Sequence, residues 1–197
     1  MTPWIIAAAG LFALGLVAVA VLIGLRRSAK TAIAGGGSSL TPVRADKLQR
    51  FVENTAGFVV TTAHTFDASP ERVWAALDTN GFFSWLPLIN GMRYPDQDRG
   101  VGATRVFDGF LVAGAEQVVA REEGHRLALT ATTSSVPFAV KSIAEEYVLS
   151  PTDSGATTLT WTLAAQPRLG WLLPYQLFAP LARPFARWSL RGLASRL

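Results

Sequence analysis

The first 25 residues of the chain contain no charged side chain, and this run restricts the possible folds more than any other feature. Residues 3–25 are mostly aliphatic, and as a helix they would be about 34 Å long at ~1.5 Å per residue. The hydrocarbon core of a bilayer is about 30 Å thick, so the run predicts one membrane-spanning helix, with Trp4 at an interface. A cleaved signal peptide would need a basic n-region and a shorter apolar run, so we expect an uncleaved anchor over residues 1–25.

The charges beyond this run predict its orientation. Arg26, Arg27 and Lys30 directly follow it and no basic residue precedes it, so the positive-inside rule predicts a single-pass cell-membrane protein whose main domain is cytoplasmic. The formal net charge of +4 also conceals an acidic stretch, residues 51–167, between two basic flanks. An acidic domain without a known nucleic-acid module disfavours nucleic acid as a partner.

The second basic flank, residues 168–197, has five arginines and no acidic residue. These arginines either form a solvated helix face or contact anionic lipid headgroups near the anchor. Under the second interpretation, we expect six residues to lie at the membrane surface: Arg26, Arg27, Lys30, Arg183, Arg187 and Arg191.

Residues 26–54 are predicted to connect the anchor to the main domain. They begin as a basic stub and continue as a Gly/Ser-rich segment, Thr31–Leu40, which is typical of a flexible linker. Thr41-Pro42 resembles an N-cap followed by a first-turn proline, and an apolar stripe predicts a short amphipathic helix over residues 42–53. A disordered spacer is the alternative for this last part.

Residues 55–197 are predicted to form one α+β domain. Phe58–Phe66 has the composition of a strand, and Ser69-Pro70-Glu71 is a strong helix start. Asn80-Gly81 should end that helix, and a short aromatic helix or turn should follow over Phe82–Leu86.

The rest of the domain is predicted to be a run of antiparallel strands and a long terminal helix. Asp108-Gly109 is a favoured two-residue hairpin turn. The expected strands are Val101–Phe107, Phe110–Arg121, His125–Thr133, Phe138–Leu149 and Thr157–Ala165. A helix bent or divided by Pro174, Pro180 and Pro184 should occupy Leu169–Leu197. One face would carry Phe178, Leu181, Phe185 and Trp188, and another Arg183, Arg187 and Arg191.

The stretch TTAHTFDASPERVWAALDTNGFFSWLP resembles the opening of the START-like, or SRPBCC, superfamily, especially its polyketide cyclase/dehydrase and lipid-transport-like members. Glu122-Glu123-Gly124-His125-Arg126-Leu127 and Tyr147-Val148-Leu149-Ser150-Pro151 fit later parts of the same pattern. The resemblance implies a helix-grip fold, in which a bent antiparallel sheet wraps around the C-terminal helix and encloses a cavity for lipids, hormones or polyketides. It does not include the membrane helix.

The sequence contains no recognisable catalytic constellation and predicts no cofactor. There is no cysteine, and two histidines make a metal site improbable. His64 is the best single candidate for a catalytic base, because it would share a strand face with apolar residues, although a core or edge histidine is the simpler interpretation. His125 should be a solvated turn residue. Arg105 would meet an inward glutamate or a ligand oxygen if it faces inward; Glu116, Glu145 and Glu146 are the nearby strand carboxylates.

Aromatic residues are the main candidates for the wall of a cavity, although each is also a plausible core residue. The predicted ligand-binding set is His64, Trp74, Phe83, Trp85, Arg105, Phe107, Phe138, Trp161 and Phe178. Phe110 is a further candidate. Three functions stay open: a membrane-anchored module that binds a lipid or other apolar molecule, a cyclase/dehydratase-like enzyme, and an interaction or stress module without a ligand. The oligomeric state and the identity of the ligand are not predicted.

Overall fold

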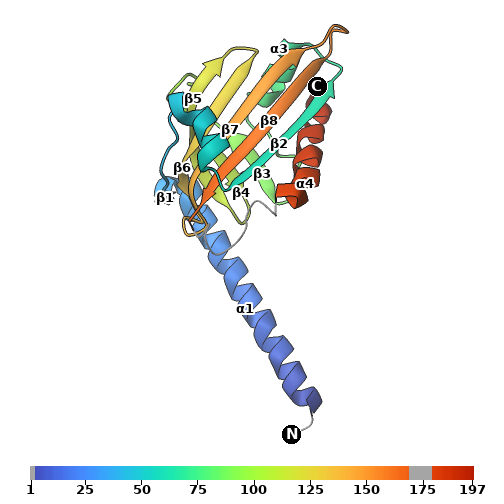
Figure 1. The fold of residues 1–197 in the computed structure, drawn as a ribbon. Coiled ribbons are helices and arrows are strands. Elements are labelled where there is room, and N and C mark those ends of the chain that lie inside the picture. The colour runs from blue at the N-terminus through green and yellow to red at the C-terminus, as the bar shows by residue number, and fades with distance from the viewer. Residues whose placement is uncertain (1–2, 169–178) are drawn as a thin grey trace.

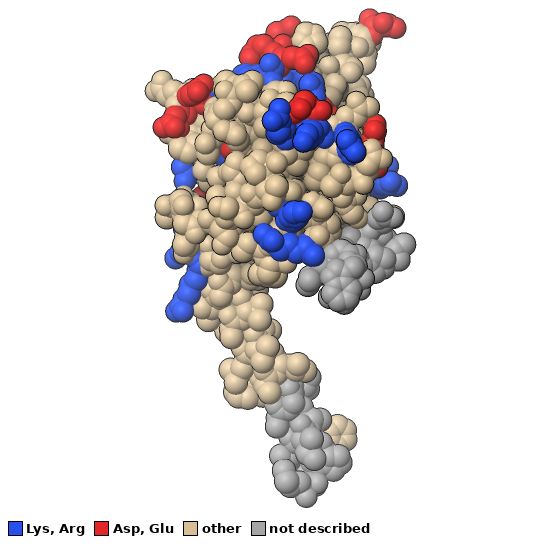
Figure 2. All heavy atoms as spheres, turned by 60° about the vertical axis from the view of Figure 1, so that its left-hand side comes forward, with Lys and Arg blue, Asp and Glu red and all other residues tan. Residues whose placement is uncertain are grey.

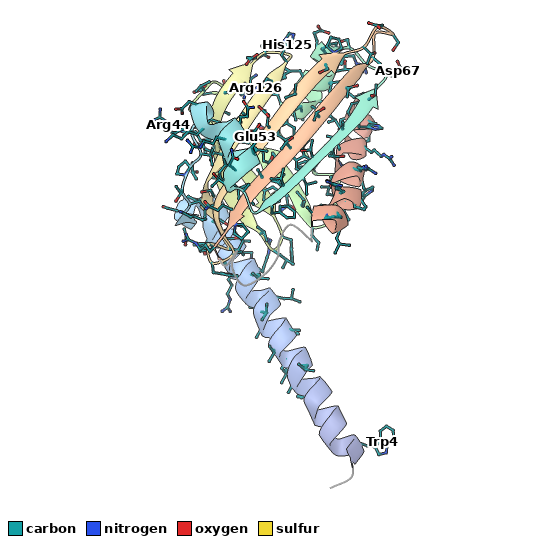
Figure 3. The ribbon with its side chains drawn as sticks, viewed as in Figure 1. Trp4, Arg44, Glu53, Asp67, His125 and Arg126 are labelled. Carbon is teal, nitrogen blue, oxygen red and sulfur yellow. The ribbon has the colours of Figure 1, made fainter. Side chains whose placement is uncertain are left out.

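The N-terminal helix α1 (Pro3–Thr31) projects from a compact domain in the computed structural model, which describes residues 3–168 and 179–197 (Figure 1). Among these residues it provides the one helix long and apolar enough to cross a membrane. Its apolar side chains from Phe12 to Ile23 are largely exposed, and Trp4 extends from its free end (Figure 3). Such a continuous exposed apolar surface is unusual on a soluble protein and fits contact with lipid.

The Gly/Ser segment predicted as a flexible linker is instead built into the domain. α1 continues to Thr31, a helical turn follows over Ala32–Gly36, and Ser38–Ser39 form strand β1. β1 pairs with β6 (Arg126–Ser134), and the next residues hydrogen-bond to both neighbouring strands: the Leu40 N–H donates to the Thr132 carbonyl and the Thr41 N–H to the Lys141 carbonyl. The composition was misleading because backbone hydrogen bonds to a sheet do not require large side chains.

The core of the domain is a curled antiparallel sheet with the strand order β2-β8-β7-β6-β5-β4-β3, and β1 pairs with β6 outside this path. The expected helix-grip class, α+β with one N-terminal helix, is therefore confirmed. The strands are β2 (Phe58–Phe66), β3 (Ile89–Arg93), β4 (Thr104–Gly109), β5 (Ala113–Glu122), β6, β7 (Val140–Pro151) and β8 (Thr157–Pro167).

Two details of the strand prediction were wrong. Strand β3 was not predicted, because Asn90-Gly91 inside it looks like a break; Gly91 has a φ of 121° and lies at a bulge opposite β4. The Asp108-Gly109 pair is not a hairpin turn, since both residues belong to β4 and the turn falls on residues 110–112. The Phe110 N–H donates to the Leu88 carbonyl, which continues the pairing toward β3 and displaces the turn.

Both faces of the sheet are covered. α3 (Pro70–Leu77), which begins after Ser69 as predicted, and α4 (Ala179–Arg191) lie on the concave face, around the main apolar core. Successive helical turns from Ala45 to Thr55 cover the convex face with Leu48 and Phe51. This helical segment confirms the predicted amphipathic one, but it begins at Ala45, so Thr41-Pro42 is not its cap.

The terminal helix presents a different face to the sheet from the one predicted. Its buried residues include Ala186, Ser189 and Leu190, whereas Leu181, Phe185 and Trp188 are 74%, 54% and 48% exposed. Small residues allow the helix to approach the sheet closely, and a Cβ placed on Gly192 in the following turn (Gly192–Arg196) would overlap Trp85. Arg183, Arg187 and Arg191 are exposed. Pro184 lies inside α4, and Pro174 and Phe178 lie outside the described residues.

Candidate ligand cavity

A cavity of about 260 Å³ lies between the concave face of the sheet and α4. Strands place alternate side chains on one face, so β4, β5, β6, β7 and β8 each contribute residues from their inward positions. The wall is mostly apolar, and it includes Phe83, Leu86, Ile89, Met92, Phe107, Ala131, Ile143, Trp161, Leu163 and Phe185. A larger surface hollow of about 430 Å³ beside α3, lined by Arg72, Thr79 and Arg196, lies outside this sheet–helix space.

One wall of the cavity is charged. Glu116 and Glu145 line it, and the guanidinium of Arg105 lies between the two carboxylates. Arg105 donates from Nε and Nη2 to Glu116 Oε2 at 3.2 and 3.1 Å, and its Nη2 lies 3.8 Å from Glu145 Oε2. The three side chains are 1%, 7% and 8% exposed. The wall therefore holds two carboxylates and one cation out of contact with bulk water.

The buried environment favours the protonated, uncharged form of the Glu145 carboxyl. Burial and the nearby Glu116 charge raise its pKa from 4.5 to about 7, although Arg105 and a hydrogen bond from Tyr147 act in the opposite direction. The Tyr147 hydroxyl donates to Glu145 Oε2 at 2.6 Å, and burial raises the tyrosine's own pKa well above its usual value. Near neutral pH, Glu145 can therefore either donate or accept a proton.

Three buried polar atoms in this region have no hydrogen-bond partner among the described residues. They are Arg105 Nη1, Trp161 Nε1 and Thr62 Oγ1. Trp161 lines the cavity, stacks on Tyr147 with centroids 6.0 Å apart, and is opposite Thr62 in the β2–β8 register. Trp161 also helps to lower the Glu145 pKa, so its indole N–H lies close to that carboxyl without acceptable hydrogen-bond geometry. Buried donors of this kind normally bind water or a ligand oxygen.

The cavity opens toward the end of the domain from which α1 leaves. Val112 and Phe185 line it and are 42% and 54% exposed, so they mark its mouth. The turns before β5 and β7 and the start of α4 lie at this end (Figure 1). They carry a group of exposed apolar residues that we call the rim: Leu88, Phe110, Val112, Phe138, Leu181 and Phe185.

The base of α1 contacts the rim directly. Arg26 Nη1 donates to the Phe110 carbonyl at 3.1 Å, and its guanidinium carbon lies 4.3 Å from the centre of the Phe110 ring. Two residues later, the Ser28 hydroxyl donates to the Ser135 carbonyl at 2.6 Å. Ala29 and Ala32 are buried beside Ala113, so the junction between helix and domain is packed rather than loose.

Four of the nine predicted ligand residues lie in or immediately behind the wall. Phe83, Phe107 and Trp161 line the cavity, and Arg105 lies behind them, paired with the lining glutamates. Trp85 is one layer further out: its ring packs against Phe83, and its Nε1 donates to the Ser189 carbonyl at 2.9 Å.

The remaining predicted residues do not line the cavity. Half-buried His64 contacts the edge of Phe66, and burial and Arg191 lower its pKa. Trp74 donates to Glu123 at 2.6 Å near the opposite end. Phe138 is 68% exposed on the rim, because it precedes β7 instead of belonging to it. Phe178 lies outside the described residues.

The remaining side-chain predictions can also be placed. Phe110 is on the rim, 43% exposed, and His125 occupies a turn at the far end of the domain (Figure 3). Glu146 faces outward, where Arg126 donates to it at 2.7 Å. In the described ranges 3–168 and 179–197, no three His, Cys, Asp or Glu residues gather as a metal site would require.

The sequence did contain a signal for the lining residues outside the predicted ligand-binding set. Ile143, Glu145, Tyr147 and Leu149 alternate along β7, and a carboxylate inside such an inward-facing set is costly to bury without partners. The partners, Arg105 on β4 and Glu116 on β5, come from distant parts of the chain. Their meeting depends on strand register, which alternation alone does not determine.

Comparisons with known proteins give a family and a fold. The family model described as polyketide cyclase / dehydrase and lipid transport matches residues 57–197. No curated protein matches the chain. Similar solved structures include TTHA0849 from Thermus thermophilus, with 18% identity and a TM-score of 0.56, which covers 70% of this chain and 95% of that one. A START superfamily protein from Mycobacterium smegmatis has 15% identity and a TM-score of 0.51, with coverages of 70% and 92%.

Proposed function

We propose, from the premise that this chain belongs to the polyketide cyclase/dehydrase and lipid transport family, that it is a membrane-anchored protein that holds an apolar small molecule between its sheet and α4. The observation that carries the proposal is the cavity itself: about 260 Å³ of mostly apolar space with a polar wall. Binding sites for small molecules typically combine an apolar lining with a few polar groups, although this one is slightly smaller than the usual ~300–1,000 Å³. It fits a small amphiphile, or one segment of a larger lipid.

The membrane is the second part of the proposal. α1 has the length and apolar surface for a span, and its basic end, with Arg26, Arg27 and Lys30, adjoins the rim. In the face shown in Figure 2, acidic side chains gather at the end of the domain farthest from α1. This polarity favours an arrangement in which the rim rests on an anionic cytoplasmic leaflet and the acidic end points away from it.

The rim gives the cavity a direct route to the bilayer. Exposed aromatic and aliphatic side chains around an opening favour insertion at the headgroup level. The packed junction at Ser28 and Ala29 keeps the mouth on the same side as the span. A molecule dissolved in the membrane would then reach the cavity without crossing water. Of the three predicted arginines on α4, Arg183 lies nearest to the rim end of the helix.

Ligand occupancy can be tested by native mass spectrometry of the full chain released from lipid nanodiscs. A bound small molecule should be present in the wild type and lost in Ala131→Leu, which adds volume inside the cavity. Ala63→Leu, on the exposed face of β2, is the matched control and should keep the ligand. If no molecule is bound and Ala131→Leu changes nothing, the third function, an interaction module with a filled interior, replaces this proposal.

Membrane position can be tested with single cysteines, because the chain has none of its own. An environment-sensitive dye on Phe138→Cys should report an apolar, lipid-quenched site, whereas the same dye on Ser154→Cys, in the turn before β8, should report water. Labelling of Ser154→Cys by an impermeant maleimide only after cell lysis would support a cytoplasmic domain. Equal dye spectra at both positions would refute the proposed contact between rim and bilayer.

A second candidate function, catalysis on the bound molecule, is favoured by one observation. Glu145 has a pKa of about 7, hydrogen-bonds to Tyr147 and faces the cavity, which suits a general acid or base. The co-purified molecule should then be converted by the wild type on incubation and returned unchanged by Glu145→Gln. Identical masses before and after incubation would leave binding as the function.

A further inference from the structure

The charges around the cavity are unequal, and this inequality restricts which ligands it accepts. Two carboxylates, Glu116 and Glu145, line it, and one cation, Arg105, lies behind them and pairs with both. The described α4 residues that line it, Phe185 and Ser189, are uncharged, and the arginines of α4 are exposed on its other side. Residues 169–178 contain no charged side chain, so the segment outside the described residues adds nothing to this count.

The Arg26 guanidinium lies at the rim, on Phe110, and the buried charges at the far end of the domain are neutralised locally. At the far end, Arg121 donates to both carboxylate oxygens of Asp78 at 3.1 and 2.8 Å, and Tyr94 donates to the same carboxylate at 3.0 Å. Half-buried His64 lies beside Phe66 and does not line the cavity. Among the buried groups, Glu116 and Glu145 together with Arg105 therefore leave one negative charge, or one proton in its place, on the cavity wall.

Buried N–H groups without a hydrogen-bond partner determine which polar group the ligand should carry. Arg105 Nη1 and Trp161 Nε1 are N–H groups with no acceptor among the described residues, and Trp161 lines the cavity. A ligand oxygen can accept from such donors, and a hydroxyl can also donate to a carboxylate. An anionic ligand would also supply acceptor oxygens, but it would place a further negative charge against a wall that already has one in excess.

We propose that this cavity selects uncharged amphiphiles that carry a hydroxyl group and rejects anionic ones such as fatty acids. The inference rests on the proposed function, because it requires that the cavity binds a ligand. It adds the chemical class: an apolar body with one neutral oxygen-bearing end, oriented with that end toward Arg105, Glu116 and Glu145. A wall with equal numbers of carboxylates and cations would show no such charge preference.

The test compares two probes with the same eight-carbon chain, 1-octanol and octanoate. Binding to the full chain in nanodiscs is measured calorimetrically at pH 8, with empty nanodiscs as the reference for partitioning. Wild type should bind octanol at least about tenfold more tightly than octanoate. A tenfold ratio of affinities corresponds to the free energy of roughly one pKa unit, which is the size expected for repulsion between like charges. Octylammonium, with the opposite charge, should bind better than octanoate.

Variants separate this charge preference from the general cost of burying any anion. Glu145→Gln leaves one carboxylate with one cation, so the gap between octanol and octanoate should narrow. The double change Glu116→Gln and Glu145→Gln leaves Arg105 in excess, and octanoate should then bind more tightly than octanol. Glu146→Gln is the matched control, because Glu146 is the neighbouring residue on β7 and pairs with Arg126 on the outer face.

The outcomes distinguish this inference from the function on which it rests. Equal wild-type affinities, or a gap that is the same in Glu145→Gln and Glu146→Gln, would overturn the charge selection while the cavity remained a binding site. If none of the eight-carbon probes binds to the wild type, the proposed function fails together with the inference. If the double variant does not fold, the comparison of the two single variants is sufficient to decide.

Discussion

Replacing Glu145 with glutamine should change how the stability of this protein depends on pH. The buried carboxyl has a pKa of about 7 in the folded chain and an ordinary value of 4.5, raised mainly by burial and by Glu116. Between these two values the folded state binds more protons than the unfolded state, so the free energy of unfolding must fall as pH rises. The difference corresponds to about 3 kcal/mol at 1.36 kcal/mol per pKa unit.

The sign of this effect is opposite to that of a carboxylate in a favourable salt bridge. A paired carboxylate usually has a lowered pKa and loses stability as pH falls, whereas Glu145 lowers the stability as pH rises from about 4.5 to about 7. Glutamine keeps the shape and an oxygen that accepts from Tyr147, but it cannot ionise. Glu145→Gln should therefore gain about 3 kcal/mol relative to wild type between pH 4.5 and pH 8.

The assay is urea-induced unfolding of the full chain in nanodiscs at several pH values, followed by the near-ultraviolet signal of its tryptophans. The informative quantity is the difference in unfolding free energy between variant and wild type at each pH, since other titrating groups cancel in that difference. Glu146→Gln is the matched control for the substitution itself, because it replaces a partly exposed carboxylate beside Arg126 on the outer face of the same strand. A difference in unfolding free energy that stays constant from pH 5 to pH 8 would refute the argument that the surroundings of Glu145 favour its protonated form.

Three further predictions concern how the domain is held together. Gly192→Ala should destabilise the fold by about 1–3 kcal/mol in thermal unfolding, because a Cβ there would overlap the Trp85 indole and overpack the contact between the C-terminal helical segment and the core. Asp78→Ala should cost about 1.5–3 kcal/mol in urea unfolding, because it removes the bidentate partner of the largely buried Arg121 guanidinium, which then keeps only Glu123. The Leu40 amide should exchange slowly in hydrogen-exchange mass spectrometry, because it donates to the sheet.

Each of these has its own control. Gly24→Ala adds a methyl group where nothing lies within 4 Å, and it should not lower the stability. Asp46→Ala removes a fully exposed ion pair with Arg44, and it should leave the stability almost unchanged. Exchange at Leu40 as fast as in an unstructured peptide would mean that the segment is a free linker after all.

The sequence predicted correctly the helices and strands that are determined by residues close together in the chain. Strand β2 and the start of α3 were predicted because strand-forming composition, Ser69 and Pro70 act within a few residues. β3 was missed because its stability comes from pairing with β4, which offsets a glycine that locally favours a break. The inward face of α4 was misjudged because the helix approaches through small residues, and a search for large apolar residues selects the opposite face.

The cavity residues show the same division between local and distant causes. Phe83, Phe107 and Trp161 were identified because large aromatic residues are a strong signal wherever they lie. Trp74 and Phe138 carry the same signal but lie far from the cavity or on its rim, so aromaticity alone does not distinguish wall from surroundings. The charged wall depends on the register of three strands, and only the structure brings Arg105, Glu116 and Glu145 together.

The pairing of β1 with β6 affects how far this domain can reach. A free chain of ten residues, such as Thr31–Leu40 was predicted to be, would let its ends separate by about 16–19 Å on average and in any direction. The pairing of β1 with the sheet removes this freedom. A domain anchored by α1 would therefore stay at a fixed distance from the bilayer, and the same side of the domain would always face the bilayer. Under the proposed function, a protein that exchanged ligand with this domain would have to approach at that distance from the bilayer. Extra residues inserted after Gly37 should therefore change which proteins it can meet, while the affinity of the cavity stays the same.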